Sequence, residues 1–383
     1  MNQPPARIDA VHDEHDPEAL RRDRLLAALT LIAGIGLCLG LPFALQYGAA
    51  FFLPLTASIV IAIALVPVLE WLERRGLPAP LAAGTCVLMF LIIANVALAS
   101  IIVPAIEWFR LLPTRIDRIQ DNLAPLLDLY KNLESYVNST LRQFAAGSYT
   151  GGVKAPPTAA VAAPGSLVEF AATSAPGAII EAFFALLVIY FFLSGWTRIR
   201  RGLITRRSSF GGAMATARVI QEVVDDTSSY LGTITVINVC LGLVVATALW
   251  FMGMPYPAMW GGIVALFNYI PYFGPILAAI LLGLGGLMTF TDIWSALVPA
   301  AIMIGAHLVE ANVITPLVVG HRLTINPLLI LISLSFWGWV WGTAGMLLAV
   351  PLLIIIQTVL AAAGKPDVAG FLFEHGTLVD ERD

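Results

Sequence analysis

Charged side chains are scarce in this sequence. Only 12% of its 383 residues are Asp, Glu, Lys or Arg, whereas 58% are hydrophobic. Soluble domains usually carry about a quarter charged residues, so the composition excludes an ordinary soluble domain and predicts an integral membrane protein. The net charge of −4 is accompanied by no basic stripe with interleaved aromatic residues. We therefore expect the lipid bilayer, and no nucleic acid, as a partner.

Several signatures of chemistry are also missing. There is no G-x-x-x-x-G-K-[ST] phosphate loop, which leaves ATP-driven transport by this chain without support. There is no Cys/His metal spacing and no G-x-S-x-G elbow, so we expect no enzyme activity, no cofactor and no metal site. Each of the three cysteines lies in an apolar run, where cysteine behaves as a small buried hydrophobe: Cys38, Cys86 and Cys240.

Long runs without charge are what the sequence has in abundance. Residues 25–105 contain three of them, each near the ~20 residues that a helix needs to cross a bilayer. We expect three transmembrane helices, at about 25–45, 49–70 and 80–105. Residues 1–24 are polar and acid-rich, and we expect disorder there. Three arginines, at 21, 22 and 24, abut the first run; positive residues beside a span favour the cytoplasm, which predicts a cytoplasmic N-terminus.

The middle of the chain changes character. Residues 106–146 have apolar positions at three- and four-residue spacing with charges between them, which predicts extracytoplasmic amphipathic helices jointed near Pro125. They either pack on their own neighbours or contact lipid headgroups. Residues 147–177, rich in Gly, Ala, Pro, Ser and Thr, predict a flexible linker. A fourth span is expected at 178–196.

Arginines follow the fourth span with no acid among them: Arg198, Arg200, Arg201, Arg206 and Arg207. This bias is the strongest topological signal in the chain, and it predicts that residues 197–230 form basic and amphipathic helices in the cytoplasm. Residues 231–363 then predict a C-terminal transmembrane core, and residues 364–383 a tail.

Two elements of this core, 257–289 and 326–362, are interrupted. Proline lacks an amide donor and clashes with the preceding turn, and freed carbonyls at bilayer depth are costly unless protein or water meets them. Broken backbone in a membrane therefore usually lines a cavity, and discontinuous segments in corresponding positions point to a transporter's binding site. The pattern fits either a broken span or a re-entrant hairpin in each case.

The residues expected along such a pathway lie at the interruptions and at the helix ends near them: Asn268, Tyr269, Pro271, Tyr272, Gly274, Pro275, Pro316, Gly320, Trp341 and Gly342. Asn268, Tyr269 and Tyr272 offer hydrogen bonds to a polar solute, or else form a structural joint with interfacial anchors. The tryptophans around 341 also fit a membrane-interface belt.

Glu310 is the sharpest candidate for ion or proton coupling. It lies inside an apolar run, where a carboxylate is costly unless it is neutralised or paired. His307 is three residues earlier, on the same helical face, and Asn312 and Thr315 add polar atoms nearby. Glu310 is thus predicted to carry a proton in a transport cycle; the alternative is a structural pair or a cap.

Four motifs resemble one known family. NYIPYFGP (268–275), E-x-N-x-x-T-P-x-x-x-G (310–320), N-P (326–327) and W-G-x-x-G-M-x-L-A-V-P (341–351) are similar to the AI-2E family of bacterial permeases. The resemblance implies about eight membrane segments with both termini in the cytoplasm. It also implies export of small molecules, the namesake being the quorum-sensing signal autoinducer-2, while some relatives are linked to sodium/proton exchange.

We therefore expect an all-α polytopic protein of the bacterial inner membrane, with about eight membrane segments, two of them discontinuous or re-entrant, plus amphipathic extramembrane helices. Three functions are weighed: gradient-driven export of a small polar molecule, sodium (lithium)/proton antiport, and a non-transporting membrane scaffold. Small residues in long spans allow close helix contact, which leads us to expect a homo-oligomer of unknown order: Gly283, Gly285 and Gly286.

Overall fold

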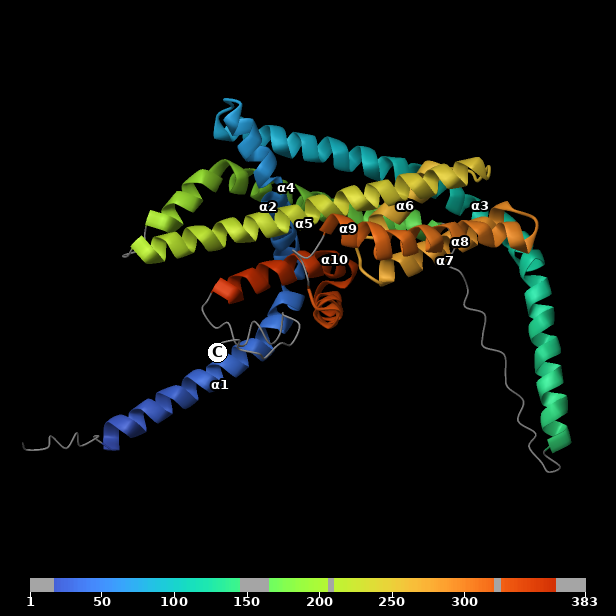
Figure 1. Ribbon diagram of the computed structural model, residues 1–383, viewed down its shortest axis with the longest axis horizontal. Helices are drawn as coiled ribbons and strands as arrows, with labels where there is room; N and C mark the ends of the chain where they lie inside the picture. Colours follow the sequence, from blue (N-terminus) through green and yellow to red (C-terminus); the bar gives the residue numbers. More distant parts are fainter. Residues whose placement is uncertain (1–16, 145–164, 206–209, 320–324, 363–383) are drawn as a thin grey trace, which may run out of the picture. The chain divides into compact units, whose positions relative to one another are not determined.

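Helices make up the architecture throughout the part of the chain that can be described. The computed structural model describes residues 17–144, 165–205, 210–319 and 325–362, and no strand occurs within these ranges (Figure 1). Seven of the described helices are long and apolar enough to cross a membrane, and two further apolar helices are shorter. The expectation of an all-α polytopic membrane protein is confirmed.

The first compact unit, residues 1–52, contains α1 (Pro17–Tyr47) and the first turn of the next helix. Its candidate span, Leu25–Tyr47, is apolar on all sides and has no buried residues, as expected of a helix solvated by lipid. The helix ends at Gly48, whose backbone N–H donates to the Ala44 carbonyl at 2.9 Å.

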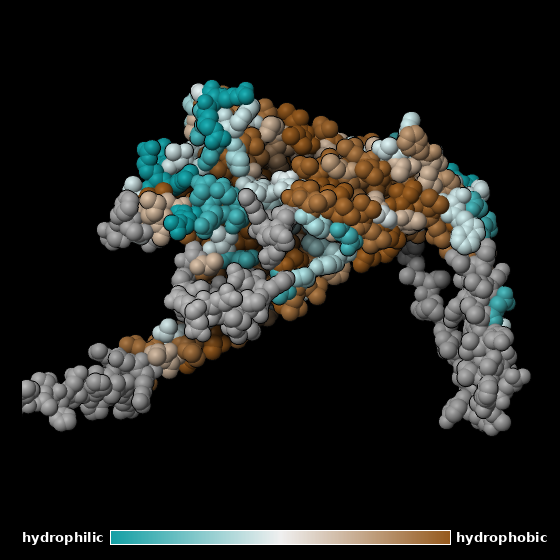
Figure 2. Space-filling view, in the orientation of Figure 1, coloured by the Kyte–Doolittle hydropathy of each residue, from teal (hydrophilic) through white to brown (hydrophobic). Residues whose placement is uncertain are grey.

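The second unit begins with four long helices: α2 (Ala49–Arg74), α3 (Ala79–Phe144), α4 (Gly165–Thr205) and α5 (Phe210–Phe251). Apolar side chains from all four pack into one cluster, with Leu69 of α2, Cys86 of α3, Leu193 of α4 and Val224 of α5 buried in it. Figure 2 shows apolar residues along much of the helix lengths and hydrophilic ones gathered over the ends of α2 and α4.

Three of these helices are longer than the sequence predicted. The span at 80–105 and the amphipathic segment after it form one continuous helix of 66 residues, which bends along its length (Figure 1), because the loss of one hydrogen bond at a proline can kink a helix without ending it. Residues 165–177, expected in a linker, are helical in α4, in keeping with the high helix propensity of their Leu and Ala residues. The cytoplasmic amphipathic segment and the fifth span are likewise one helix, α5.

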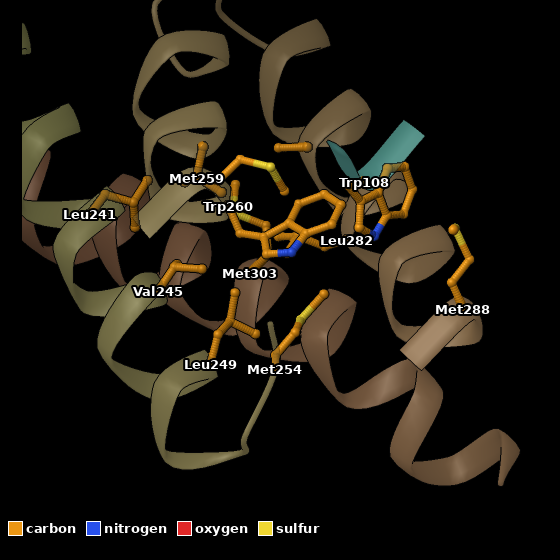
Figure 3. Packing of buried hydrophobic residues seen from close by; sticks show 12 residues of the cluster. Trp108, Leu241, Val245, Leu249, Met254, Met259, Trp260, Leu282, Met288 and Met303 are labelled. Atoms are coloured by element: carbon orange, nitrogen blue, oxygen red, sulfur yellow. The ribbon is translucent and has the colours of Figure 1, made fainter. Parts of the chain in front are cut away.

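The C-terminal region contains the elements that position the site. These are α6 (Pro257–Phe267), α7 (Phe273–Thr289), α8 (Ile293–Val309), the π-helix η1 (Glu310–Ile314), α9 (Thr315–Val319) and α10 (Pro327–Ala362). Helix α5 packs against α6, and α7 packs against α8. Their shared core surrounds Trp260, which meets Trp108 of α3 edge to face, with ring centroids 5.2 Å apart (Figure 3).

The first interrupted element is a helical hairpin rather than a broken span. Trp260 near the start of α6 lies against Gly285 near the end of α7, and Phe267 at the end of α6 lies against Gly274 at the start of α7. These pairs are spaced about equally on either side of the tip, so the two helices run antiparallel. An α6 of 11 residues is about 16 Å long, roughly half of a ~30 Å hydrocarbon core.

The second interrupted element, α10, folds back in the same way. Its backbone leaves helical geometry at Trp341 and at Gly342, where φ is 63°. The Ser333 hydroxyl donates to the Ala349 carbonyl at 2.8 Å, and Trp337 lies against Gly345, so the arms 327–340 and 343–362 are antiparallel. Both interrupted elements are therefore helical hairpins.

The tip of the first hairpin packs against the second hairpin. The α6–α7 hairpin opens where α5 ends and α8 begins, and α10 packs against α5. Ile270 at the first tip packs with Leu334 and Ala349 of the second hairpin. Leu334 and Ala349 each lie seven residues from the break at Trp341 and Gly342, so the tip of the first hairpin meets the arms of the second.

The small residues of α7 serve contacts within one protomer. A methyl group on Gly283 would touch Ala300 of α8, one on Gly285 would meet Trp260, and one on Gly286 would fall on the Ala296 carbonyl. These glycines permit close packing of α7 against α6 and α8. They supply no argument for a homo-oligomer, which was the use that the sequence suggested.

Candidate functional site

Glu310 is buried within the bundle, with 5% of its surface exposed. His307 Nδ1 lies 3.0 Å from Glu310 Oε2, and the Thr315 hydroxyl donates a hydrogen bond to Oε1. Each carboxylate oxygen therefore has a partner on its own helix. Such pairing is what makes a carboxylate tolerable at bilayer depth.

The backbone around Glu310 is a π-helix, a feature that the sequence reading missed. Residues Glu310–Ile314 are wound so that the Thr315 N–H bonds to the Glu310 carbonyl, five residues back. Pro316 follows directly and lacks the N–H that would continue the regular pattern, which explains a bulge at this place. Single π-turns occur often at functional sites, and this one aligns Thr315 with the Glu310 side chain.

The tip of the first hairpin supplies the third side of the cluster. The Asn268 side chain, also buried, interacts with the Glu310 carboxylate and donates from Nδ2 to Asn238 Oδ1 of α5 at 2.8 Å. Asn238 has no exposed surface, and its own Nδ2 has no hydrogen-bond partner. A buried donor without an acceptor is costly, so the Asn238 amide is an unsatisfied polar group beside the Glu310 cluster.

The turn at this tip is strained. Tyr272 has φ 65° and ψ −53°, and the Phe273 N–H donates to the Pro271 carbonyl at 2.7 Å. Together these define a γ-turn of the rare positive-φ kind. A non-glycine residue in this region costs of order 1–3 kcal/mol and persists where the surroundings hold it, often at functional sites.

The predicted site residues fall into two groups. Glu310, His307, Thr315 and Asn268 come together, and Pro271, Gly274 and Pro275 shape the tip beside them. Tyr269 lies at the same tip and donates its hydroxyl to Thr235 Oγ1 of α5 at 2.8 Å.

The other predicted residues lie elsewhere. Asn312 is exposed, and its amide donates to the Leu308 carbonyl at 2.8 Å, so it turns away from Glu310. Pro316 and Tyr272 are exposed. Trp341 and Gly342 form the tip of α10, where Trp341 stands 4.9 Å from the Trp337 ring. Gly320 lies outside the described residues.

Polar residues on neighbouring helices were overlooked. Asn238 and Thr235 lie in α5, and the signal was present, because a charge-free run of this length makes any Asn within it costly. On α3, Asn122 donates to the carbonyls of Leu287 and Phe290 at 3.1 and 2.9 Å. Arg115 and Arg118 of the same helix reach the Met288 and Thr289 carbonyls, so α3 caps the C-terminal end of α7.

The geometry suits a proton better than a metal ion. Among the described residues, no three His, Cys, Asp or Glu side chains gather closely enough to hold a metal. Both Glu310 oxygens face donors, whereas Na⁺ and divalent cations need several oxygen ligands. A carboxyl group beside an imidazole, enclosed by amides and a hydroxyl, can release and accept a proton.

Comparison with known proteins identifies the family in which this arrangement occurs. A family model described as AI-2E family transporter matches residues 27–365. The chain belongs to the AI-2E family. The AI-2E motifs that the sequence resembled, 268–275 and 310–320, are the same segments that build the hairpin tip and the π-helix, and the family identifies the chain as a multi-pass membrane transporter.

Relatives within the AI-2E family are similar over most of their length. The "AI-2 transport protein TqsA" of Escherichia coli (strain K12) is 28% identical over 349 residues, covering 91% of this chain and 96% of the relative. The "Putative transport protein YhhT" of the same strain is 24% identical over 340 residues, 86% of each. The "Putative transport protein YrrI" of Bacillus subtilis (strain 168) is 24% identical over 332 residues, 81% of this chain and 85% of the relative.

Proposed function

We propose that this AI-2E family protein is a gradient-driven permease that exports a small polar molecule of the autoinducer-2 kind across the bacterial inner membrane. The observation that carries the proposal is the cluster of Asn238, Asn268 and Glu310 at the first hairpin tip. The relative named for AI-2 transport supports the class of solute. The arginines before the first span, at 21, 22 and 24, and those after the fourth span, at 198, 200 and 201, support a cytoplasmic N-terminus.

The route follows from the two hairpins. A hairpin that enters the bilayer without crossing it leaves part of the bilayer depth for water beyond its tip, and in this proposal the two hairpins enter from opposite sides of the membrane. Where the first tip packs against the arms of the second hairpin, at Ile270 and Leu334, an apolar contact closes the route in this proposal. A solute that binds the Asn238 and Asn268 amides would cross this contact as the hairpins rearrange.

Glu310 couples the movement to protons in this proposal. A protonated Glu310 no longer needs its His307 partner, whereas an ionised one holds His307, Thr315 and Asn268 together. Proton release or uptake therefore changes the strength of the bonds that fix the hairpin tip. This differential interaction is what a coupling ion must have with the two states of a carrier.

The test is transport by purified protein in liposomes. A panel of small polar solutes that includes autoinducer-2 is offered with and without a proton or sodium gradient. Glu310→Gln keeps the shape of the side chain and one accepting oxygen but cannot ionise, so gradient-driven flux should fall to the level of empty liposomes. Glu181→Gln, an exposed position on α4, is the matched control and should transport normally.

Both variants must elute and melt like the wild type, which separates a transport defect from misfolding. Flux through Glu310→Gln equal to that of the control would remove Glu310 from the mechanism. If wild-type protein moves no solute under any gradient and yet co-purifies with a partner, a membrane scaffold replaces the permease.

A sodium (lithium)/proton antiporter is the second candidate, because a buried carboxyl group beside an imidazole is also what proton exchange requires. Everted vesicles separate the two functions. Added sodium should alkalinise the vesicle interior if the protein is an antiporter, and should leave it unchanged if protons only drive solute export.

A further inference from the structure

A second polar site lies away from the hairpins, at the ends of α2 and α4. A hollow of about 430 Å³ opens there, lined by Glu70, Glu73, Arg74, Trp196, Thr197 and Arg200. The candidate spans Ala49–Arg74 and Ile179–Thr205 both run into this region. The hollow therefore sits where two membrane helices meet the aqueous boundary, over the hydrophilic patch seen at one side of Figure 2.

Two acidic and two basic side chains line the hollow, but they do not form hydrogen bonds with one another. Glu70 is 3.7 Å from an Arg200 nitrogen and 4.0 Å from an Arg74 nitrogen, and both separations exceed hydrogen-bond length. The Glu73 side chain has no hydrogen bond or ion pair with any described residue. Two carboxylates and two guanidinium groups thus face the hollow with most of their hydrogen-bonding capacity unused.

An indole donor adds an independent sign of a missing ligand. Trp196 is 6% exposed, and its Nε1–H is buried without an acceptor. Tryptophan usually finds a partner for this group when it is buried. Trp196 also lines the hollow, and we assign the missing acceptor to a group bound there.

We propose that this hollow binds the headgroup of a zwitterionic phospholipid that carries a phosphate and a primary ammonium, as phosphatidylethanolamine does. The phosphate accepts hydrogen bonds from Arg74, Arg200 and the Trp196 indole, because guanidinium groups suit phosphate oxygens. The ammonium donates to Glu70 and Glu73.

Charge and location together select this ligand. An anionic headgroup without an ammonium would leave Glu73 unpaired beside a negative charge, and a choline headgroup has no N–H to donate to either carboxylate. Exposed apolar residues on the same two helices, among them Trp71 and Leu203, offer lipid chains a surface to lie against. A dissolved phosphoethanolamine would lack that contact.

Retention of lipid by the purified full-length chain tests the site. Protein in detergent is equilibrated with equimolar phosphatidylethanolamine, phosphatidylcholine and phosphatidylglycerol of identical chains, and bound lipid is counted by native mass spectrometry. Phosphatidylcholine cannot donate the charge-assisted hydrogen bonds that the ethanolamine ammonium donates to the carboxylates. We therefore expect phosphatidylethanolamine to be retained over phosphatidylcholine by about tenfold. Glu73→Gln, which breaks no internal contact, should bring the two lipids to near parity.

A matched pair of arginine variants adds a second readout. Arg200→Gln should lower phosphatidylethanolamine retention by a similar factor, whereas Arg198→Gln, an exposed position on the same helix outside the hollow, should leave it unchanged. Equal retention of the ethanolamine and choline lipids by the wild type, or a preference for phosphatidylglycerol, would overturn the proposal. So would equal effects of the two arginine variants.

A soluble arm distinguishes a lipid from a free headgroup. Glycerophosphoethanolamine has the same polar groups without acyl chains, and at millimolar concentration it should displace little of the bound lipid. Full displacement would show that the hollow binds a dissolved zwitterion, and the assignment to lipid would fail.

Discussion

The two helical hairpins use one backbone plan with opposite chemistry at their tips. The α6–α7 tip carries Asn268 and Tyr269, which bond to Asn238, Thr235 and Glu310 around it. The α10 tip carries Trp337 and Trp341, whose rings contact each other. The first tip also holds a strained tyrosine where the second has a glycine. The comparison suggests that the first hairpin handles the transported species and the second closes against it.

The largest effects should come from exchanging what is special at each tip. Trp341→Ala removes a large buried ring and should destabilise the protein by ~3–5 kcal/mol, with flux per folded molecule nearly unchanged. Asn268→Ala should lower flux per folded molecule strongly while shifting the melting temperature less. Thermal melting in detergent and liposome flux, measured on both variants, check this split. Equal flux defects per folded molecule would break the proposed division of roles.

Tight closure of the hairpins is the next test. In both, a methyl group on one glycine would fall on a backbone carbonyl of the opposite arm: Gly274 against Phe267 and Gly345 against Trp337. Gly274→Ala and Gly345→Ala should each destabilise by ~1–3 kcal/mol, as overpacking does. Gly305→Ala is the control, because nothing lies within 4 Å of its added methyl, and it should melt like the wild type.

The first tip holds a tyrosine at positive φ where the second holds a glycine, so a glycine at the first tip should stabilise the protein. Tyr272→Gly should relieve the positive φ and stabilise the first hairpin by up to ~1 kcal/mol, less the backbone entropy that glycine adds to the unfolded chain. A lower flux at higher melting temperature would indicate that the strain serves transport. A fall in melting temperature would show that the exposed Tyr272 ring contributes more than its strained backbone costs.

The smallest effect concerns the mouth of the first hairpin. Asp292 caps α8 by accepting the Ser295 backbone N–H at 2.9 Å, and this bond lowers the pKa of the Asp292 carboxyl below its ordinary value. A lowered folded-state pKa gives stability that is present above the unfolded pKa and is lost as pH falls through the folded one. Melting from pH 6 to 3 should therefore show a small loss in the wild type that Asp292→Asn lacks.

The sequence predicted where the chain is interrupted but not how. Pro271, Gly274 and Pro275 predicted one break, and the Trp/Gly run at 336–342 predicted the other, because the local backbone preferences of these residues are strong. Reversal of direction depends on contacts such as Ser333 with Ala349, which local pattern does not encode. Pro125 shows the converse, since α3 continues through it.

The candidate site was predicted in the same uneven way. Glu310, His307 and Thr315 share one helix, so spacing alone brought them together. Asn238 is 30 residues before Asn268, and its role emerges only when α5 and the hairpin tip pack. Asn312 has the right spacing but bonds to its own helix, because the π-helix changes which residues face Glu310.

The caps that α3 places on α7 have a mechanical consequence. Asn122, Arg115 and Arg118 hold the last carbonyls of α7, and these residues belong to the same unbroken 66-residue helix that begins at Ala79. Figure 1 shows that α3 is bent, so that its distal part runs in a different direction from the part that begins at Ala79. The caps therefore join the base of the first hairpin to a bent helix, and a force on the distal part of α3 would act on that base through the bend.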